Sequence, residues 1–263
     1  MLKRELKVNF KSFIIWTSIL LAIFLVVYLM YPSIIQSESG KMIDEMMEMF
    51  PEEVIKMFNM DISSMDTAYG WLKTEGFVFV LLLTGVYAGV LGSSILLKEE
   101  SDKTIEYLNS LPITRGTILI KKIICGIVYI VLMVIIMAIF NYIGLSISGE
   151  FDKKQYWLLS ITPLLSALPL FTISVFVSTF FSKTKKTFGI GLGIALLSYF
   201  VQILSEMSEV AEFLKYFTVY TLADIRNVIV EISINPVMVI LSGAITGAFI
   251  IASYIRYNKK ELV

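Results

Sequence analysis

The sequence predicts an all-α integral membrane protein with six transmembrane helices and with both termini in the cytoplasm. The 263-residue chain is 57% hydrophobic and 17% charged, and its mean hydropathy is +0.79. Soluble globular chains carry about 25% charged residues, so this composition is typical of a membrane protein. The chain has no histidine and one cysteine, which closes the usual routes to a metal site or an internal disulfide.

Six stretches without Asp, Glu, Lys or Arg are the expected membrane spans. Each is close to or longer than the roughly 20 residues that an α-helix needs to cross the hydrocarbon core. None alternates with the period of two that marks a barrel strand. We therefore expect one transmembrane domain over residues 1–263, with spans at about 12–37, 76–97, 123–149, 155–182, 187–205 and 232–255.

The net charge of zero hides a strong asymmetry between the two sides of the membrane. With the N-terminus placed in the cytoplasm, the inside segments hold 15 basic and 6 acidic residues, and the outside segments hold 7 basic and 16 acidic residues. Loops rich in Lys and Arg stay in the cytoplasm. The charge pattern thus predicts a multi-pass protein of the cell membrane with both termini inside.

The first 11 residues place Leu2, Leu6 and Phe10 four residues apart, with basic residues on the other faces. This spacing predicts an interfacial helix that lies on the anionic leaflet before the chain turns into the first span. A frayed basic tail that only enforces the topology is the alternative.

The outer segment 38–75 is expected to be largely helical. Seven of the 13 methionines lie between 42 and 65. Thioether groups can bind Cu(I), but they also pack adaptably against apolar surfaces. Because no histidine and no further cysteine accompany them, packing against the bundle or a hydrophobic substrate is the favoured interpretation.

The spacing of apolar residues in the loop 98–117 predicts a short amphipathic helix. Ser101 or Asp102 can cap it, and Ile105, Leu108 and Leu111 recur on one face. Pro112 ends the helix. A helix of this kind, between two spans and parallel to the membrane, offers a surface for a cytoplasmic partner.

The segment 206–231 mixes acidic and apolar residues and is too short to cross the membrane twice. It either dips into the outer leaflet as two short helices, a re-entrant segment covered by the protein, or forms a surface loop. Small residues elsewhere predict close helix packing. The positions expected to pack are Gly85, Gly89 and Gly92 in the second span and Gly243 and Gly247 in the sixth.

The chain lacks the residues that self-powered transport or catalysis needs. The six stretches contain no ionisable acid or base, whereas ion-coupled transporters usually need one. No nucleotide-binding, metallohydrolase or serine-hydrolase motif occurs. We therefore expect no catalytic, cofactor-binding or metal-binding residues in this chain, and an external energy source if it moves a substrate uphill.

The loop 98–117 also resembles the cytoplasmic signature of the permease subunits of bacterial type 2 ABC (ATP-binding cassette) exporters. In that family an acidic pair precedes a Thr-hydrophobic-Glu-x-Leu helix, which is followed by Leu-Pro-hydrophobic-Ser/Thr-Arg and a lysine that opens the third span. The matching residues are Glu99, Glu100, Thr104, Ile105, Glu106, Leu108, Leu111, Pro112, Ile113, Thr114, Arg115 and Lys121. The six spans, the N-terminal helix and the apolar outer segment extend the resemblance over most of the chain.

The resemblance implies a pair of permeases, identical or paralogous, bound to two separate ATPase subunits that hold ATP and magnesium. The helix at 99–111 would be the coupling helix that docks in the ATPase. Glu99, Glu100 and Glu106 would meet basic ATPase residues or hold the loop, and Arg115 would anchor the turn. Related exporters move hydrophobic or amphipathic peptides, drugs or lipids, along a path between the second and fifth spans of the two permeases.

Two other functions fit the residues alone. One is a channel or facilitator, which would transport without nucleotide, and the other is a membrane assembly or sensor protein that transports nothing. Copurification of a nucleotide-binding subunit distinguishes the exporter from both. No feature of the sequence suggests nucleic-acid binding.

Overall fold

The computed structural model describes residues 1–35, 67–101, 114–182, 184–207 and 209–260, and this part of the chain contains helices and no β-strand. The long helices are α1 (Leu2–Ile35), α5 (Phe77–Ile95), α8 (Arg115–Ser148), α9 (Lys153–Ser178), α10 (Thr184–Met207) and α12 (Pro236–Lys259). The short ones are α4 (Ala68–Trp71), η2 (Leu72–Gly76), α6 (Lys98–Ser101), η3 (Glu209–Phe217), η4 (Tyr220–Ala223) and α11 (Ile225–Glu231).

All six long helices are apolar and long enough to cross a membrane, which confirms the predicted all-α membrane fold. Local sequence sets several of their ends. Side chains of Thr114, Asp152 and Asn235 accept hydrogen bonds from backbone N–H groups at the starts of α8, α9 and α12. Gly149 ends α8 with φ 152°, a conformation that a residue with a Cβ rarely adopts.

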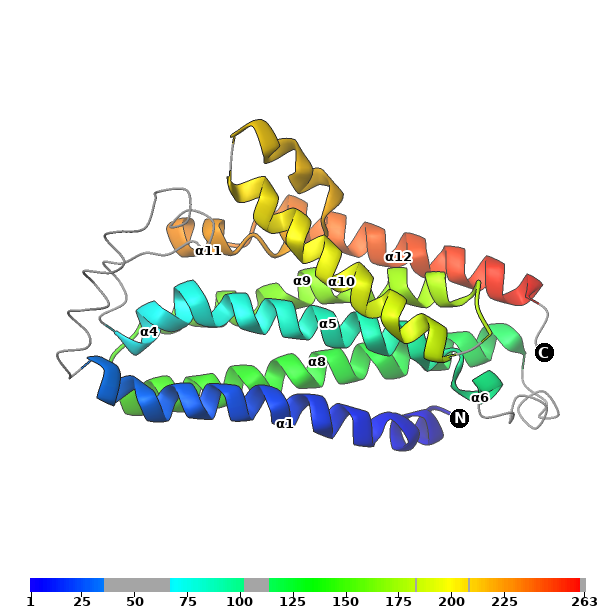
Figure 1. Ribbon diagram of the computed structural model, residues 1–263, viewed down its shortest axis with the longest axis horizontal. Coiled ribbons are helices and arrows are strands. Elements are labelled where there is room, and N and C mark those ends of the chain that lie inside the picture. The colour runs from blue at the N-terminus through cyan, green and yellow to red at the C-terminus, as the bar shows by residue number, and fades with distance from the viewer. Residues whose placement is uncertain (36–66, 102–113, 183, 208, 261–263) are drawn as a thin grey trace.

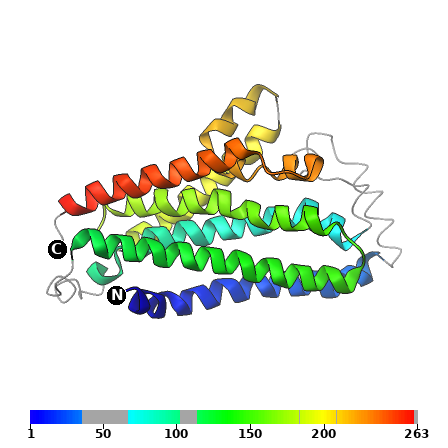
Figure 2. The ribbon, with the colours of Figure 1, turned by 180° about the vertical axis from the view of Figure 1, so that it is seen from behind.

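The helices form an elongated bundle whose two ends differ (Figure 1). The N-terminus, the C-terminal end of α12 and α6 lie at one end, which we call the termini end. The short helices α4 and α11 lie at the opposite end, which we call the far end, and the view from behind agrees (Figure 2). This arrangement places both described ends of the chain at one end of the bundle; that this end faces the cytoplasm stays a prediction.

The centre of the bundle is formed by α5 and α9, which pack along each other. About 72% and 67% of their most apolar windows are buried, against 22%, 17% and 11% in α1, α10 and α12. Helix α8 packs between α1 and α9, α10 crosses α5, and α12 lies on α9. The outer three helices thus carry most of the apolar surface that the bundle leaves exposed.

The predicted break between an interfacial helix and the first span is wrong. Residues 2–35 form one continuous helix, because the first eleven residues contain no Gly or Pro that would interrupt it. Leu2 and Leu6 are half-buried and pack against the core, while Phe10 is exposed. The N-terminal turns of α1 are therefore part of the bundle.

Three of the five predicted packing glycines do lie at close contacts. A methyl group on Gly89 would lie 2.6 Å from the carbonyl oxygen of Gly191 in α10, and one on Gly92 would lie 2.4 Å from that of Phe171 in α9. Gly85 lies against the hydroxyl group of Tyr220 in η4. At these positions only glycine lets the neighbouring group approach.

Gly243 and Gly247 make no such contact with the described residues, and their role in helix packing stays a prediction. A methyl group on either would meet no atom of the described residues within 4 Å. Their helix, α12, lies on the outside of the bundle, so close packing there would need a neighbour other than the described residues.

The segment after the fifth span is helical, as η3, η4 and α11. Tyr220, Leu222 and Ala223 of η4 are buried against α9, whereas much of η3 is exposed. The segment is thus half packed into the bundle rather than an open surface loop, and its entry into the outer leaflet remains a prediction. In the outer segment 38–75, residues 68–75 are helical; the methionine cluster lies outside the described residues.

Candidate functional site: a buried ion network at the base of the coupling loop

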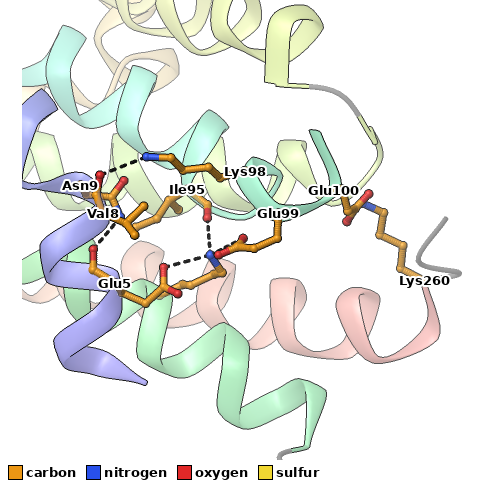
Figure 3. Close-up of polar contacts among 9 residues, drawn as sticks. Glu5, Val8, Asn9, Ile95, Lys98, Glu99, Glu100 and Lys260 are labelled. Carbon is orange, nitrogen blue, oxygen red and sulfur yellow. Dashed lines mark hydrogen bonds and ion pairs between the residues drawn. The ribbon is translucent and has the colours of Figure 1, made fainter. Parts of the chain in front are cut away.

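Most of the predicted coupling helix lies outside the described residues. Thr104, Ile105, Glu106, Leu108, Leu111 and Pro112 belong to that part. The described residues on either side of it are Glu99 and Glu100 in α6 and Arg115 at the start of α8. All three take part in a network of charged groups at the termini end of the bundle. Figure 3 shows the contacts of Glu99 and Glu100.

The centre of the network is Lys122, a residue of α8 whose side chain is 1% exposed. Its ammonium group lies 2.7 Å from Glu99 Oε2 and 3.0 Å from Glu5 Oε2. It also donates a hydrogen bond of 2.9 Å to the carbonyl oxygen of Ile95. One lysine therefore connects α1, the end of α5, α6 and α8.

The local course of the chain explains these contacts. Helix α5 ends at Ile95, so its last carbonyl groups lack partners within the helix and attract a cation. The short helix α6 follows at once and turns both of its glutamates into the protein, where they are 4% and 6% exposed. The lysine thus satisfies a helix end and a buried carboxylate together.

Further hydrogen bonds fix α1 to the same place. Lys98 Nζ donates to the carbonyl oxygen of Val8 over 3.1 Å, and Asn9 Nδ2 donates to that of Glu5 over 3.0 Å. The hydroxyl group of Tyr129 in α8 donates to the carbonyl oxygen of Leu6. The bond from Asn9 lies within α1, whereas those from Lys98 and Tyr129 hold the N-terminal turns of α1 against the segment after α5 and against α8.

A second set of contacts connects α6 with the C-terminal end of the chain. Lys260 Nζ lies 2.8 and 3.0 Å from the two carboxylate oxygens of Glu100 and donates to the carbonyl oxygen of Phe181 over 2.6 Å. Arg115 Nη1 donates to the carbonyl oxygen of Lys260 over 2.7 Å. The start of α8, the end of α9 and the end of α12 are therefore joined to α6.

The ion-paired groups of the network are buried, and each therefore needs a partner of opposite charge. A buried charge without a partner costs several kcal/mol, so removing one member of a buried pair is strongly destabilising. Here two carboxylates share one ammonium group, and Glu5 Oε1 is buried without a partner among the described residues. We found no group of three or more His, Cys, Asp or Glu residues that would suit a metal ion in the described part.

The structure gives the described site residues partners inside the chain. Glu99 and Glu100 contact Lys122 and Lys260, and Arg115 contacts the backbone of Lys260. Their roles in meeting the ATPase, holding the loop and anchoring the turn stay predictions. The sequence analysis missed Glu5, Lys122 and Lys260. Lys121 matched the family signature, but it is the next residue, Lys122, that shares a helix face with the buried Ile118, Leu119 and Cys125. The three- and four-residue spacing of this face is a signal that could have identified it.

The comparisons with known proteins identify the family of the chain. The sequence model of the ABC-2 family transporter protein family matches residues 1–262. No curated protein and no solved structure matches the chain. Proteins of this family are the membrane components of ABC transporters and are not ATPases themselves. The chain therefore belongs to the ABC-2 transporter family, as a multi-pass permease subunit that partners with ABC ATPase subunits.

Proposed function

We propose that this permease belongs to an exporter that couples ATP hydrolysis to the efflux of a hydrophobic or amphipathic substrate such as a peptide, a drug or a lipid. Two ATPase subunits bind ATP and magnesium, and a second permease, identical or paralogous, completes the complex. The chain lies in the cell membrane with its termini end in the cytoplasm, where the excess of Lys and Arg belongs.

The observation that carries this proposal is the fixing of both α6 glutamates at the base of the coupling loop. Glu99 is tied through Lys122 to α1 and α8, and Glu100 is tied through Lys260 to the ends of α9 and α12. An ATPase that displaces the loop would pull on α1, α8 and α12 through short, buried ion pairs and on the end of α9 through a hydrogen bond. Such pairs resist stretching because separating them leaves buried charges unpaired.

The energy source must be external because the chain supplies none. Its six uncharged stretches contain no acid or base for ion coupling, and it has no nucleotide-binding motif. The apolar spans and the apolar surface of the outer helices suit a substrate that partitions into the membrane. These features support export of an amphipathic molecule over transport of a hydrated ion.

The test is ATPase binding and stimulation in a reconstituted complex. We expect the double substitution Leu108→Asp and Leu111→Asp to abolish copurification of the ATPase while the permease still inserts. The substitution Glu100→Lys should keep the ATPase bound but lower substrate-stimulated hydrolysis, and adding Lys260→Glu should restore part of it. Unchanged ATPase binding in the leucine variant would refute the coupling-helix assignment.

The orientation has a separate test in a Cys125→Ser background. A cysteine introduced at position 45 should react with a membrane-impermeant reagent added outside intact cells, and one at position 185 should react only after the cells are opened. The reverse pattern would overturn the topology.

A further inference from the structure

A second polar region lies at the far end of the bundle, away from the ion network. A cavity of about 450 Å³ is walled by α5 and α10, by η2, and by the three short helices η3, η4 and α11. This volume is within the range of small-ligand sites, about 300–1,000 Å³. Its walls combine charged, polar and apolar side chains, which is the composition that an amphiphile requires.

Two basic side chains of this cavity have no partner among the residues that the structure describes. Lys73 of η2 and Arg226 of α11 line it, and neither forms a hydrogen bond or an ion pair with any residue that the structure describes. Arg226 attracts Glu206 electrostatically but does not pair with it. In contrast, the third basic residue, Lys215, is paired with Glu212 over 2.6 Å, which lowers the pKa of the glutamate and raises that of the lysine. Among the described residues, two cations of this cavity thus remain available to an anionic group.

The acidic side chains of the cavity also divide into those with a described side-chain partner and one without. Glu206 accepts a hydrogen bond of 2.6 Å from Gln202, whose amide oxygen accepts one from Thr221 over 2.6 Å. Asp224 has no cationic partner among the described residues, and burial raises its pKa. Its backbone has a φ of 43°, a left-handed conformation that is uncommon outside glycine and often marks functional sites. One carboxylate is therefore left for a cationic group.

The apolar part of the cavity lies on the membrane helix α5 and on the short helix α11. Val78 and Leu81 of α5 and Ile225 and Ile229 of α11 complete the wall. A hydrocarbon chain in contact with these side chains would gain the usual free energy of removing apolar surface from water. The charged and apolar parts together describe a ligand with a polar head and an apolar tail.

We propose that this cavity binds a zwitterionic amphiphile whose head group carries a phosphate and an ammonium group. The phosphate lies between Lys73 and Arg226, the ammonium group pairs with Asp224, and the hydrocarbon contacts the apolar wall. A simple anion would leave Asp224 without a partner, and a simple cation would leave both basic side chains without one. The ligand is either a resident lipid of the bilayer or the cargo, and in the second case the inference rests on the proposed export function.

The binding test uses the full-length permease in detergent and dihexanoyl-phosphatidylethanolamine as the probe, followed by native mass spectrometry. Dihexanoyl-phosphatidylglycerol, which has the phosphate but no ammonium group, is the comparison. We expect the wild-type protein to bind the first about tenfold more tightly, the effect of one added charge-assisted contact. Equal affinity for the two lipids would overturn the proposal.

Three variants locate the site. Asp224→Asn keeps the left-handed backbone, which asparagine tolerates, and should remove the preference between the two lipids. Arg226→Gln should weaken both lipids about tenfold. Lys154→Gln, an exposed lysine of α9 outside the cavity, is the control and should bind as the wild type does. Equal weakening in the control, or unchanged binding in Arg226→Gln, would refute the site.

Reconstitution with the ATPase distinguishes the two sources of the lipid. ATP-dependent transfer of labelled phosphatidylethanolamine between leaflets, lost in Arg226→Gln, would identify cargo. Binding without transfer would identify a resident lipid. Loss of ATP coupling alone would count against the proposed export function and leave the binding result intact.

Discussion

The basic side chains at the two ends of the bundle differ in burial and in pairing. At the termini end, Lys122 and Lys260 are almost fully buried and each contacts a carboxylate and a backbone carbonyl group. At the far end, Lys73 is only partly buried, Arg226 is exposed, and neither contacts an acid among the described residues. The difference follows from solvation, because water stabilises an exposed cation that a buried position would force to pair or to neutralise.

This comparison separates charges that hold the fold from charges that can serve a ligand. A buried lysine that is fully paired cannot bind a ligand as well, and its removal should destabilise the protein because its buried carboxylate partners lose their cation. A partly exposed, unpaired cation contributes little to stability, and its loss should be felt only when an anion binds. The following variants test that separation, from the largest expected effect to the smallest.

Replacing Lys122 with methionine should have the largest effect. The substitution leaves Glu5 and Glu99 buried without a cation, which should cost roughly 3–5 kcal/mol of unfolding free energy. Thermal unfolding of the purified permease in detergent measures it. Lys121→Met is the matched control on the less buried face of α8 and should change stability by less than about 0.5 kcal/mol. Similar losses in both variants would contradict the network.

The contact between α5 and α10 should give the next largest effect. A methyl group at Gly191 would lie 2.4 Å from the carbonyl oxygen of Gly89, whereas one at Gly193 would meet no atom of the described chain within 4 Å. We expect Gly191→Ala to cost about 1–3 kcal/mol through overpacking and Gly193→Ala to stabilise α10 by about 0.5–1 kcal/mol. The same unfolding assay compares them, and stabilisation by both would show that the helices are not in contact.

A smaller, pH-dependent effect is expected from Asp224→Asn. Because the pKa of Asp224 is raised in the folded protein, the folded state binds more protons, and its contribution to stability falls as the pH rises above about 4. The asparagine variant should therefore be more stable than the wild type at pH 7, by less than about 1 kcal/mol because solvent screens the group. The gain should disappear at pH 3, and a gain that persists there would have another cause.

The smallest change in stability should follow removal of the two cavity cations that have no described partner. Lys73→Gln combined with Arg226→Gln breaks no described ion pair, so the unfolding free energy should stay within about 0.5 kcal/mol of the wild type. A large loss of stability in this variant would mean that the two ends of the bundle do not differ as described.

The sequence predicted those features that depend on residues close together in the chain. A charged residue in the hydrocarbon core is costly, so the uncharged stretches revealed all six spans, and the spacing of small residues revealed Gly89 and Gly92. It did not predict ion pairs between residues that lie far apart in the chain. The spacing of Ile118, Leu119 and Cys125 could have placed Lys122 on the buried face of α8. It could not have identified the partner of Lys122, because Glu5 lies 117 residues away in the chain.

The glycine contact has a mechanical consequence for the fifth span. Helix α10 meets α5 most closely at Gly191, about 7 residues from its first turn at Thr184 and about 16 from its last residue, Met207. At 1.5 Å per residue the two arms measure roughly 10 and 24 Å. If α10 tilts as a rigid rod about this fulcrum, its ends move in opposite directions, and the far end, which borders the cavity, travels roughly twice as far as the termini end.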